Sequence, residues 1–201
     1  MNLTVALRAR LSGRSDSEHE QAILRITIFA LVLAYMAAVY SPGDGATGLE
    51  HRELLLFQGL AAAMLLAVML FLAICSWPAP NVPRRVIGML VDAGAATFCM
   101  FMTGESGVLM VGVYLFITLG NGFRYGRGYL FACLTLCLVG FNAVVLFAPY
   151  WQGHRVTGLC LMVTLTVLPI YVSTLLKRIQ ESHVRAEVAL RECLAREQRG
   201  S

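Results

Sequence analysis

Long apolar runs are the feature that most constrains this chain. Residues 54–77 hold one strongly polar side chain, Gln58, and residues 156–176 hold no charged one. In lipid, a backbone can satisfy its own hydrogen bonds only as a helix or a closed barrel, and a helix needs about 20 apolar residues to cross. Only 14% of the residues are charged, whereas soluble domains carry about 25%. The sequence therefore predicts an all-α integral membrane protein.

Six segments have the composition of membrane spans. They are residues 22–40, 54–77, 86–103, 108–121, 129–150 and 156–176. The fourth is short, so a five-span bundle is the alternative. Nine basic residues fall before the first span, in the loops at 78–85 and 120–128, and directly after the last span, against two in the other loops. Because basic loops stay cytoplasmic, we expect six spans, with both termini in the cytoplasm.

The pattern changes after Leu176. Apolar or small residues recur at alternating spacings of three and four as far as Cys193, with charged residues between them. This seam predicts that residues 177–199 form an amphipathic helix continuous with the last span. A parallel coiled coil in a homodimer is the first interpretation, and a solvated single helix is the alternative. We expect Gly200 and Ser201 to be a cloning remnant and the chain to be the input region of a longer protein.

Motifs for catalysis or metal binding are absent from the sequence. It contains no P-loop, no HExxH and no GxSxG, and its six cysteines lie mostly in apolar runs without a CxxC pair. We therefore expect no catalytic residues, no metal and no cofactor in this chain. The net charge of +4 is too small and too dispersed to indicate nucleic acid.

Polar side chains within the predicted spans are candidates for function, because they are costly in lipid. Arg25 and Asp92 lie at similar depths in the first and third spans, which predicts a buried ion pair. That pair either holds two helices in register or borders a ligand pocket. Asn121 and Asn142 are candidates for either role. The glycines inside the spans, Gly88 among them, are interpreted only as close helix contacts.

A polar segment, residues 1–21, precedes the first span. One interpretation is an ordinary helix cap. The other is a binding site at the level of the lipid head groups, for an amphiphile whose carboxylate reaches Arg14 or Arg25. The site residues that this second interpretation adds are Arg14, Asp16, Ser17, Glu18 and Gln21. Elsewhere, Trp77, Tyr150 and Trp151 are expected to be anchors at the membrane interface.

Four segments resemble the membrane input region of RpfC-type sensor histidine kinases. They are residues 11–19, 84–92, 120–126 and 149–151. The resemblance implies a hybrid protein-histidine kinase that detects diffusible signal factor, a cis-2-unsaturated fatty acid used in bacterial quorum sensing. Its kinase, receiver and phosphotransfer domains are not in this chain. The family is often drawn with five spans and a periplasmic strip before the first, whereas the basic residues here predict six spans and a cytoplasmic strip.

We therefore predict the transmembrane sensor module of such a kinase, with a fatty acid, membrane lipid and a second copy of the chain as partners. The resemblance implies signal binding by the strip before the first span. The predicted ligand-binding residues are Arg14, Asp16, Ser17, Glu18, Gln21, Arg25, Asp92, Asn121, Arg124 and Asn142. A small transporter or channel and a ligand-free membrane anchor are the alternatives. The absence of an obvious repeat or of paired broken helices argues against the transporter.

Overall fold

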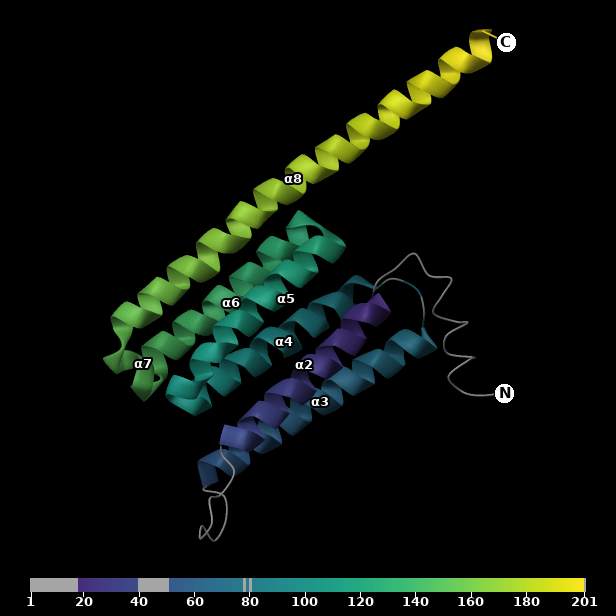
Figure 1. The fold of residues 1–201 in the computed structure, drawn as a ribbon. Helices are drawn as coiled ribbons and strands as arrows, with labels where there is room; N and C mark the ends of the chain where they lie inside the picture. Colours follow the sequence, from purple (N-terminus) through teal and green to yellow (C-terminus); the bar gives the residue numbers. More distant parts are fainter. Residues whose placement is uncertain (1–17, 40–50, 78, 80, 201) are drawn as a thin grey trace.

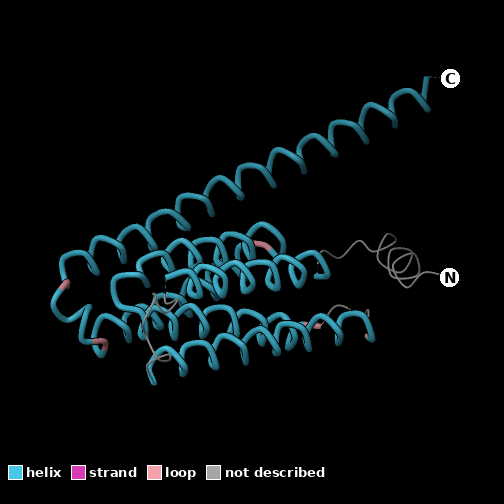
Figure 2. The backbone as a smooth tube through the Cα atoms, turned by 60° about the horizontal axis from the view of Figure 1, so that its bottom comes forward, coloured by secondary structure: helices cyan, strands magenta, loops and turns pink. Residues whose placement is uncertain are grey.

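The computed structural model describes residues 18–39, 51–77, 79 and 81–200, and this part of the chain contains helices and no strand. Its long helices are α2 (Glu18–Val39), α3 (His51–Ser76), α4 (Val82–Thr103), α5 (Met110–Tyr125), α6 (Arg127–Phe147) and α8 (Arg155–Gly200). A 3₁₀ helix, η1 (Gly104–Leu109), and a short helix, α7 (Pro149–Gly153), connect them (Figures 1 and 2). The prediction of an all-helical membrane-type bundle is confirmed.

The helices run up and down between two ends of the bundle. At one end, Gln21 at the start of α2 is hydrogen-bonded to Asn121 and Tyr125 near the end of α5, and Glu18 contacts Arg84 and Arg85. We call this the basic end. The opposite end holds η1 and α7, which contact each other. Helix α8 starts at that opposite end, returns along α5 and α6, and continues past the basic end (Figure 1).

Five stretches of the described chain are long and apolar enough to cross a membrane. They are Glu18–Ala38, His51–Ser76, Val82–Tyr125, Arg127–Phe147 and Arg155–Ala186. The third contains both α4 and α5, because η1 joins them without an intervening loop residue. The chain reverses direction in η1, so α4 and α5 run side by side (Figure 1). Gly104, at the start of the reversal, has φ 60°, a conformation that favours glycine. The described residues therefore form six long helices, of which α5 with 16 residues is the shortest.

Two expected loops are shorter than the sequence indicated. Helix α4 already begins at Val82, with a proline in its first turn, where the missing N–H needs no partner. Helix α5 continues through the predicted glycine-rich bend to Tyr125, and Gly126 alone, with φ 90°, makes the turn into α6. Helix α8 is unbroken from Arg155 to Gly200 although it contains Pro169. Composition overestimated the length of these loops because Pro83, Gly120, Gly122 and Gly128 lie inside helices.

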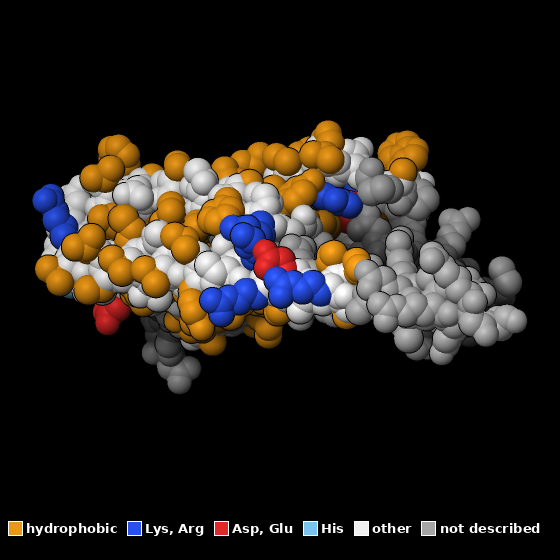
Figure 3. All heavy atoms as spheres, turned by 90° about the horizontal axis from the view of Figure 1, so that it is seen from above, with side chains coloured by type: hydrophobic (Ala, Val, Ile, Leu, Met, Phe, Trp, Pro, Cys, Tyr) orange, Lys and Arg blue, Asp and Glu red, His pale blue; other side chains and the backbone are white. Residues whose placement is uncertain are grey.

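The largest core cluster includes side chains of all six long helices and of α7. Trp151 has no exposed surface, and its ring lies edge-on to Phe141 at 5.6 Å and to Tyr150 at 5.5 Å. The prediction of Trp151 as an interface anchor is therefore wrong, because α7 turns this side chain under the bundle, whereas Trp77 is 75% exposed. Large apolar side chains cover much of the outer surface (Figure 3). A lipid-facing bundle needs such a surface.

Candidate ligand-binding site

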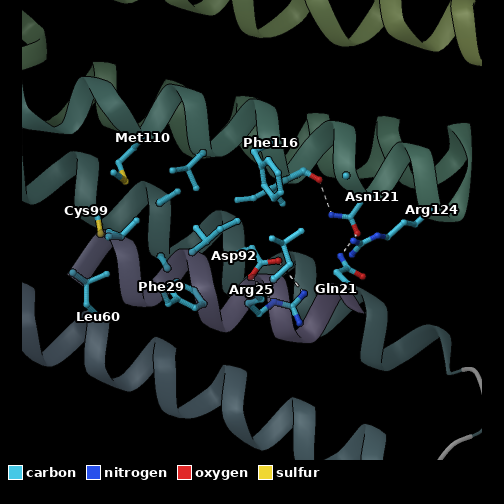
Figure 4. Close-up of a pocket in the computed structure, with 18 residues that line it drawn as sticks. Gln21, Arg25, Phe29, Leu60, Asp92, Cys99, Met110, Phe116, Asn121 and Arg124 are labelled. Carbon is cyan, nitrogen blue, oxygen red and sulfur yellow. Dashed lines mark hydrogen bonds and ion pairs between the residues drawn. The ribbon is translucent and has the colours of Figure 1, made fainter. Parts of the chain in front are cut away.

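A pocket lies between α2, α4 and α5, with Leu60 of α3 in its wall. It holds about 590 Å³ of space between atoms, counting the part that is open to the surroundings. Figure 4 shows polar side chains toward one end and apolar ones toward the other. The polar lining residues are Gln21, Arg25, Asp92, Asn121 and Arg124.

The apolar part of the pocket follows α2 and α5 away from the basic end. Phe29 and Val32 line it from α2, and Met110, Val113 and Phe116 line it from α5. The residues from Met110 to Asn121 on α5 span roughly 16 Å at the rise of an α-helix. The pocket is therefore polar at one end and apolar along the rest of its length, an arrangement that suits an amphiphile with a single apolar chain.

Arg25 and Asp92 form the deepest polar contact of the pocket. The Nε of Arg25 donates to Oδ1 of Asp92 at 2.5 Å, and its Nη2 donates to Oδ2 at 2.9 Å. Both residues are at least 91% buried. A bidentate, charge-assisted pair of this kind is strong and directional. It joins α2 to α4, as the sequence predicts.

Gly88 makes room for this ion pair. A Cβ at position 88 would lie 2.4 Å from Nη2 of Arg25 and 3.1 Å from Cζ. Because Gly88 precedes Asp92 by one turn, both face the same side of α4. The guanidinium therefore rests on bare backbone while it binds the carboxylate. Interpreting Gly88 as a mere helix contact missed this role, although its spacing from Asp92 was a usable signal.

A second polar contact closes the pocket one turn nearer the basic end. Nε2 of Gln21 donates to Oδ1 of Asn121 at 2.9 Å, and the hydroxyl of Tyr125 donates to Oε1 of Gln21 at 2.5 Å. Nδ2 of Asn121 donates to the carbonyl of Ile117 at 2.7 Å. These bonds hold α2 against α5. The sequence analysis did not single out Tyr125.

Glu18 lies outside the pocket, in contact with two arginines of α4. One carboxylate oxygen accepts from Nη2 of Arg84 and the other from Nε of Arg85. The Arg85 guanidinium also lies over the ring of Tyr125, 4.3 Å from its centroid. Glu18 is 5% exposed. Its charge is thus matched within the protein, and it fastens the start of α2 to the start of α4.

Arg124 is the cation that the pocket leaves unmatched. It is half-buried at the polar end, and Figure 4 shows it beside Asn121 and Gln21. Among the residues that the structure describes, none forms an ion pair or a hydrogen bond with its side chain. An anionic group in the pocket would therefore accept hydrogen bonds from the N–H groups of Arg124.

The structure brings five of the predicted site residues into one pocket, namely Gln21, Arg25, Asp92, Asn121 and Arg124. Glu18 is adjacent and already paired. Asn142 does not join them: its side chain is exposed, and Nδ2 donates to the carbonyl of Leu138 in its own helix. Arg14, Asp16 and Ser17 lie outside the described residues. Within the described ranges, no cluster of three or more His, Cys, Asp or Glu side chains is placed to hold a metal ion.

The fold and the pocket define a class, a multi-pass helical membrane protein with an amphipathic site between its helices. Comparison with known proteins gives the family. The chain is 33% identical over 171 residues to the sensory/regulatory protein RpfC from two strains of Xanthomonas campestris pv. campestris. Over this region it belongs to the RpfC-type sensory/regulatory proteins.

The matched region is 85% of this chain and 23% of the relatives. The chain therefore spans about a quarter of the length of the proteins it matches. No family model matches the sequence. No solved structure matches it either.

Proposed function

We propose that this chain is the inner-membrane sensor module of a hybrid histidine kinase in a quorum-sensing phosphorelay, and that it binds a cis-2-unsaturated fatty acid. Kinship with a sensory/regulatory protein supports the sensor role. The observation that carries the ligand is the pocket between α2, α4 and α5, which is apolar along most of its length and ends at Arg124. A fatty acid is complementary to this pocket, because it has one anionic head group and one apolar chain.

The carboxylate of the ligand binds at Arg124 in this proposal, and not at Arg25. Both carboxylate oxygens of Asp92 already accept from Arg25. A second carboxylate there would place another buried negative charge beside Asp92, whose carboxylate already neutralises the guanidinium. Arg124 has donors available, and the amide of Gln21 lies beside it. Charge-assisted hydrogen bonds from a guanidinium are the strongest available for such a head group.

The acyl chain lies along α5 toward Met110. The lining there comes from side chains without charge, including Phe29, Val113 and Phe116. A cis double bond beside the carboxyl group bends the chain directly below the head group, so isomers differ in how they enter. Arg14, Asp16 and Ser17 stay candidates for the head-group site on the family resemblance alone.

Signal transmission follows from the packing of α5 against α8. A ligand that binds one arrangement of α2, α4 and α5 more tightly shifts the population toward it, by no more than its difference in affinity for the two states. Helix α8 is continuous from the bundle to Gly200 and would carry that shift outward. We propose that α8 does so in a homodimer, toward kinase domains beyond this chain, with both termini in the cytoplasm.

The test is ligand binding to the purified chain in lipid nanodiscs, measured for a cis-2-unsaturated acid and its trans isomer. Arg124→Gln should weaken binding about 10- to 100-fold, the loss of one hydrogen bond to a charged group. Val113→Phe should also weaken it by filling the apolar part. The matched controls, Arg155→Gln and Val163→Phe, change exposed positions on α8 and should have no effect. Equal affinity for both isomers, or none for either, would overturn the proposal.

The ligand-free anchor is the rival, and one observation favours it. Arg25 and Asp92 neutralise each other's charge, so neither needs a charged ligand. If the pocket is only structural, Arg124→Gln in the full-length protein should leave the response to added fatty acid unchanged. A response that is lost in Arg124→Gln and kept in Arg155→Gln would exclude the anchor.

A further inference from the structure

A second hollow lies at the basic end, where α5 ends and α6 begins. Residues 122–127 line it together with Leu176 of α8, and it holds about 500 Å³ of space between atoms, counting the open part. Of the residues around it, Arg124 also lines the ligand pocket described above. The hollow therefore joins the turn between two helices to the helix that leaves the bundle.

The hollow has excess positive charge. Neither Arg124 nor Arg127 forms an ion pair or a hydrogen bond with a residue that the structure describes. Nε of Arg127 is buried and has no hydrogen-bond partner in the described part of the chain, and an N–H buried without an acceptor is unfavourable. Helix α6 begins at Arg127, so the positive end of its dipole lies at the same place. An anion at this place would accept hydrogen bonds from these arginines and lie at the positive end of the dipole.

The position of the hollow along α8 indicates where that anion comes from. Leu176 is the last residue of the apolar stretch of α8, and Lys177 and Arg178 follow it directly. The hollow thus lies at the level where α8 changes from lipid-facing to charged. Figure 3 shows several basic side chains, with an acidic one among them, near the middle of a surface that is otherwise largely apolar, and further basic ones at its far left and upper right. This is the level at which phospholipid head groups lie.

We propose that this hollow binds the phosphate of an anionic membrane phospholipid, such as phosphatidylglycerol. Arg127, which does not line the fatty-acid pocket, donates to the phosphate oxygens, and Arg124 adds a second positive charge beside it. Phe123, which lines the hollow and is 61% exposed, offers an apolar surface to the acyl chains. Basic pockets between membrane helices are known to suit anionic head groups. The bound lipid would bridge the α5–α6 turn and the exit of α8, and the proposal does not depend on the fatty-acid site.

The experiment is native mass spectrometry of the purified chain, equilibrated with equal amounts of phosphatidylglycerol and phosphatidylcholine. The wild type should retain phosphatidylglycerol preferentially. Arg127→Gln should lower that retention about five-fold, the contribution of one basic residue near the head groups. Arg127→Lys should keep most of it, because the charge remains. Arg155→Gln, which removes an exposed arginine from the opposite end of the bundle, is the matched control and should not change it.

A second measurement needs no variant. A photoactivatable phosphatidylglycerol should crosslink to peptides that contain residues 122–127 or Leu176 in the wild type. Inorganic phosphate at millimolar concentration should not displace the lipid, since it lacks the acyl chains. Crosslinking only elsewhere, equal loss in Arg127→Gln and Arg155→Gln, or displacement by free phosphate would each overturn the proposal.

Discussion

The ion pair between Arg25 and Asp92 makes the sharpest quantitative prediction. Asp92 accepts both hydrogen bonds from the Arg25 guanidinium, and both residues are buried between α2 and α4. Asp92→Leu would leave the guanidinium inside the bundle without a carboxylate. Replacing both residues, as Arg25→Met with Asp92→Leu, would remove the charges together. The single and double changes should therefore have very different consequences.

Removing one partner of a buried ion pair costs about 3–5 kcal/mol in soluble proteins. Insertion of an arginine at the centre of a membrane helix costs about 2.5–3.5 kcal/mol. We expect Asp92→Leu to lower the free energy of unfolding by about 3 kcal/mol, where these ranges meet. The double variant should fall within about 1 kcal/mol of the wild type, since replacing a whole buried pair by apolar residues is often neutral.

The assay is equilibrium unfolding of the purified chain from mixed micelles by sodium dodecyl sulfate, followed by the circular dichroism of its helices. Both single variants and the double variant complete a thermodynamic cycle. The coupling energy between the two positions should be at least about 3 kcal/mol. Two results would contradict this prediction. One is that Asp92→Leu lowers the free energy of unfolding by less than about 1 kcal/mol. The other is that the double variant loses as much free energy of unfolding as the two single variants together.

Two further changes test the contacts around this pair. Gly88→Ala should lower the free energy of unfolding by about 0.5–2 kcal/mol, because displacing the Arg25 guanidinium loses one charged hydrogen bond, which exceeds the helix propensity that alanine gains. Gly94→Ala, on the same helix with nothing within 4 Å of its Cβ, should instead be neutral or stabilising by up to about 1 kcal/mol. Glu18→Gln should speed hydrogen exchange of the backbone amides in the first turn of α2, since it loses both charged contacts to α4. The control, Glu20→Gln, changes an exposed residue of the same turn and should not speed it. Similar exchange in the two variants would contradict the role of Glu18.

The sequence predicts best those features that depend only on whether a segment lies in lipid or in water. Apolar runs without charges predicted helices in lipid, and the described chain is helical. The matched depths of Arg25 and Asp92 predicted their ion pair, because two opposite charges at one level of a bundle have few other partners. Asn142 shows the limit of this argument. It is as polar as Asn121 and sits in a predicted span, yet its own helix satisfies its amide group on the outer surface.

The residues that shape the pocket depend on which helix faces meet. Hydropathy does not record whether Gly88 touches lipid or a guanidinium, nor that Tyr125 lies under Arg85 and bonds to Gln21. These contacts join residues 40 to 104 positions apart. Their signals are single residues within patterns that many membrane helices share.

The residue pattern was enough to establish a helical membrane protein with a charged helix beyond its last span, because the cost of polar groups in lipid acts on each segment separately. Tertiary packing decided the rest. It placed the reversal at Gly104, buried Trp151, matched Glu18 to two arginines and left Arg124 unmatched by any described side chain. Whether a buried charge is satisfied depends on its neighbours in space, and only the folded bundle defines them.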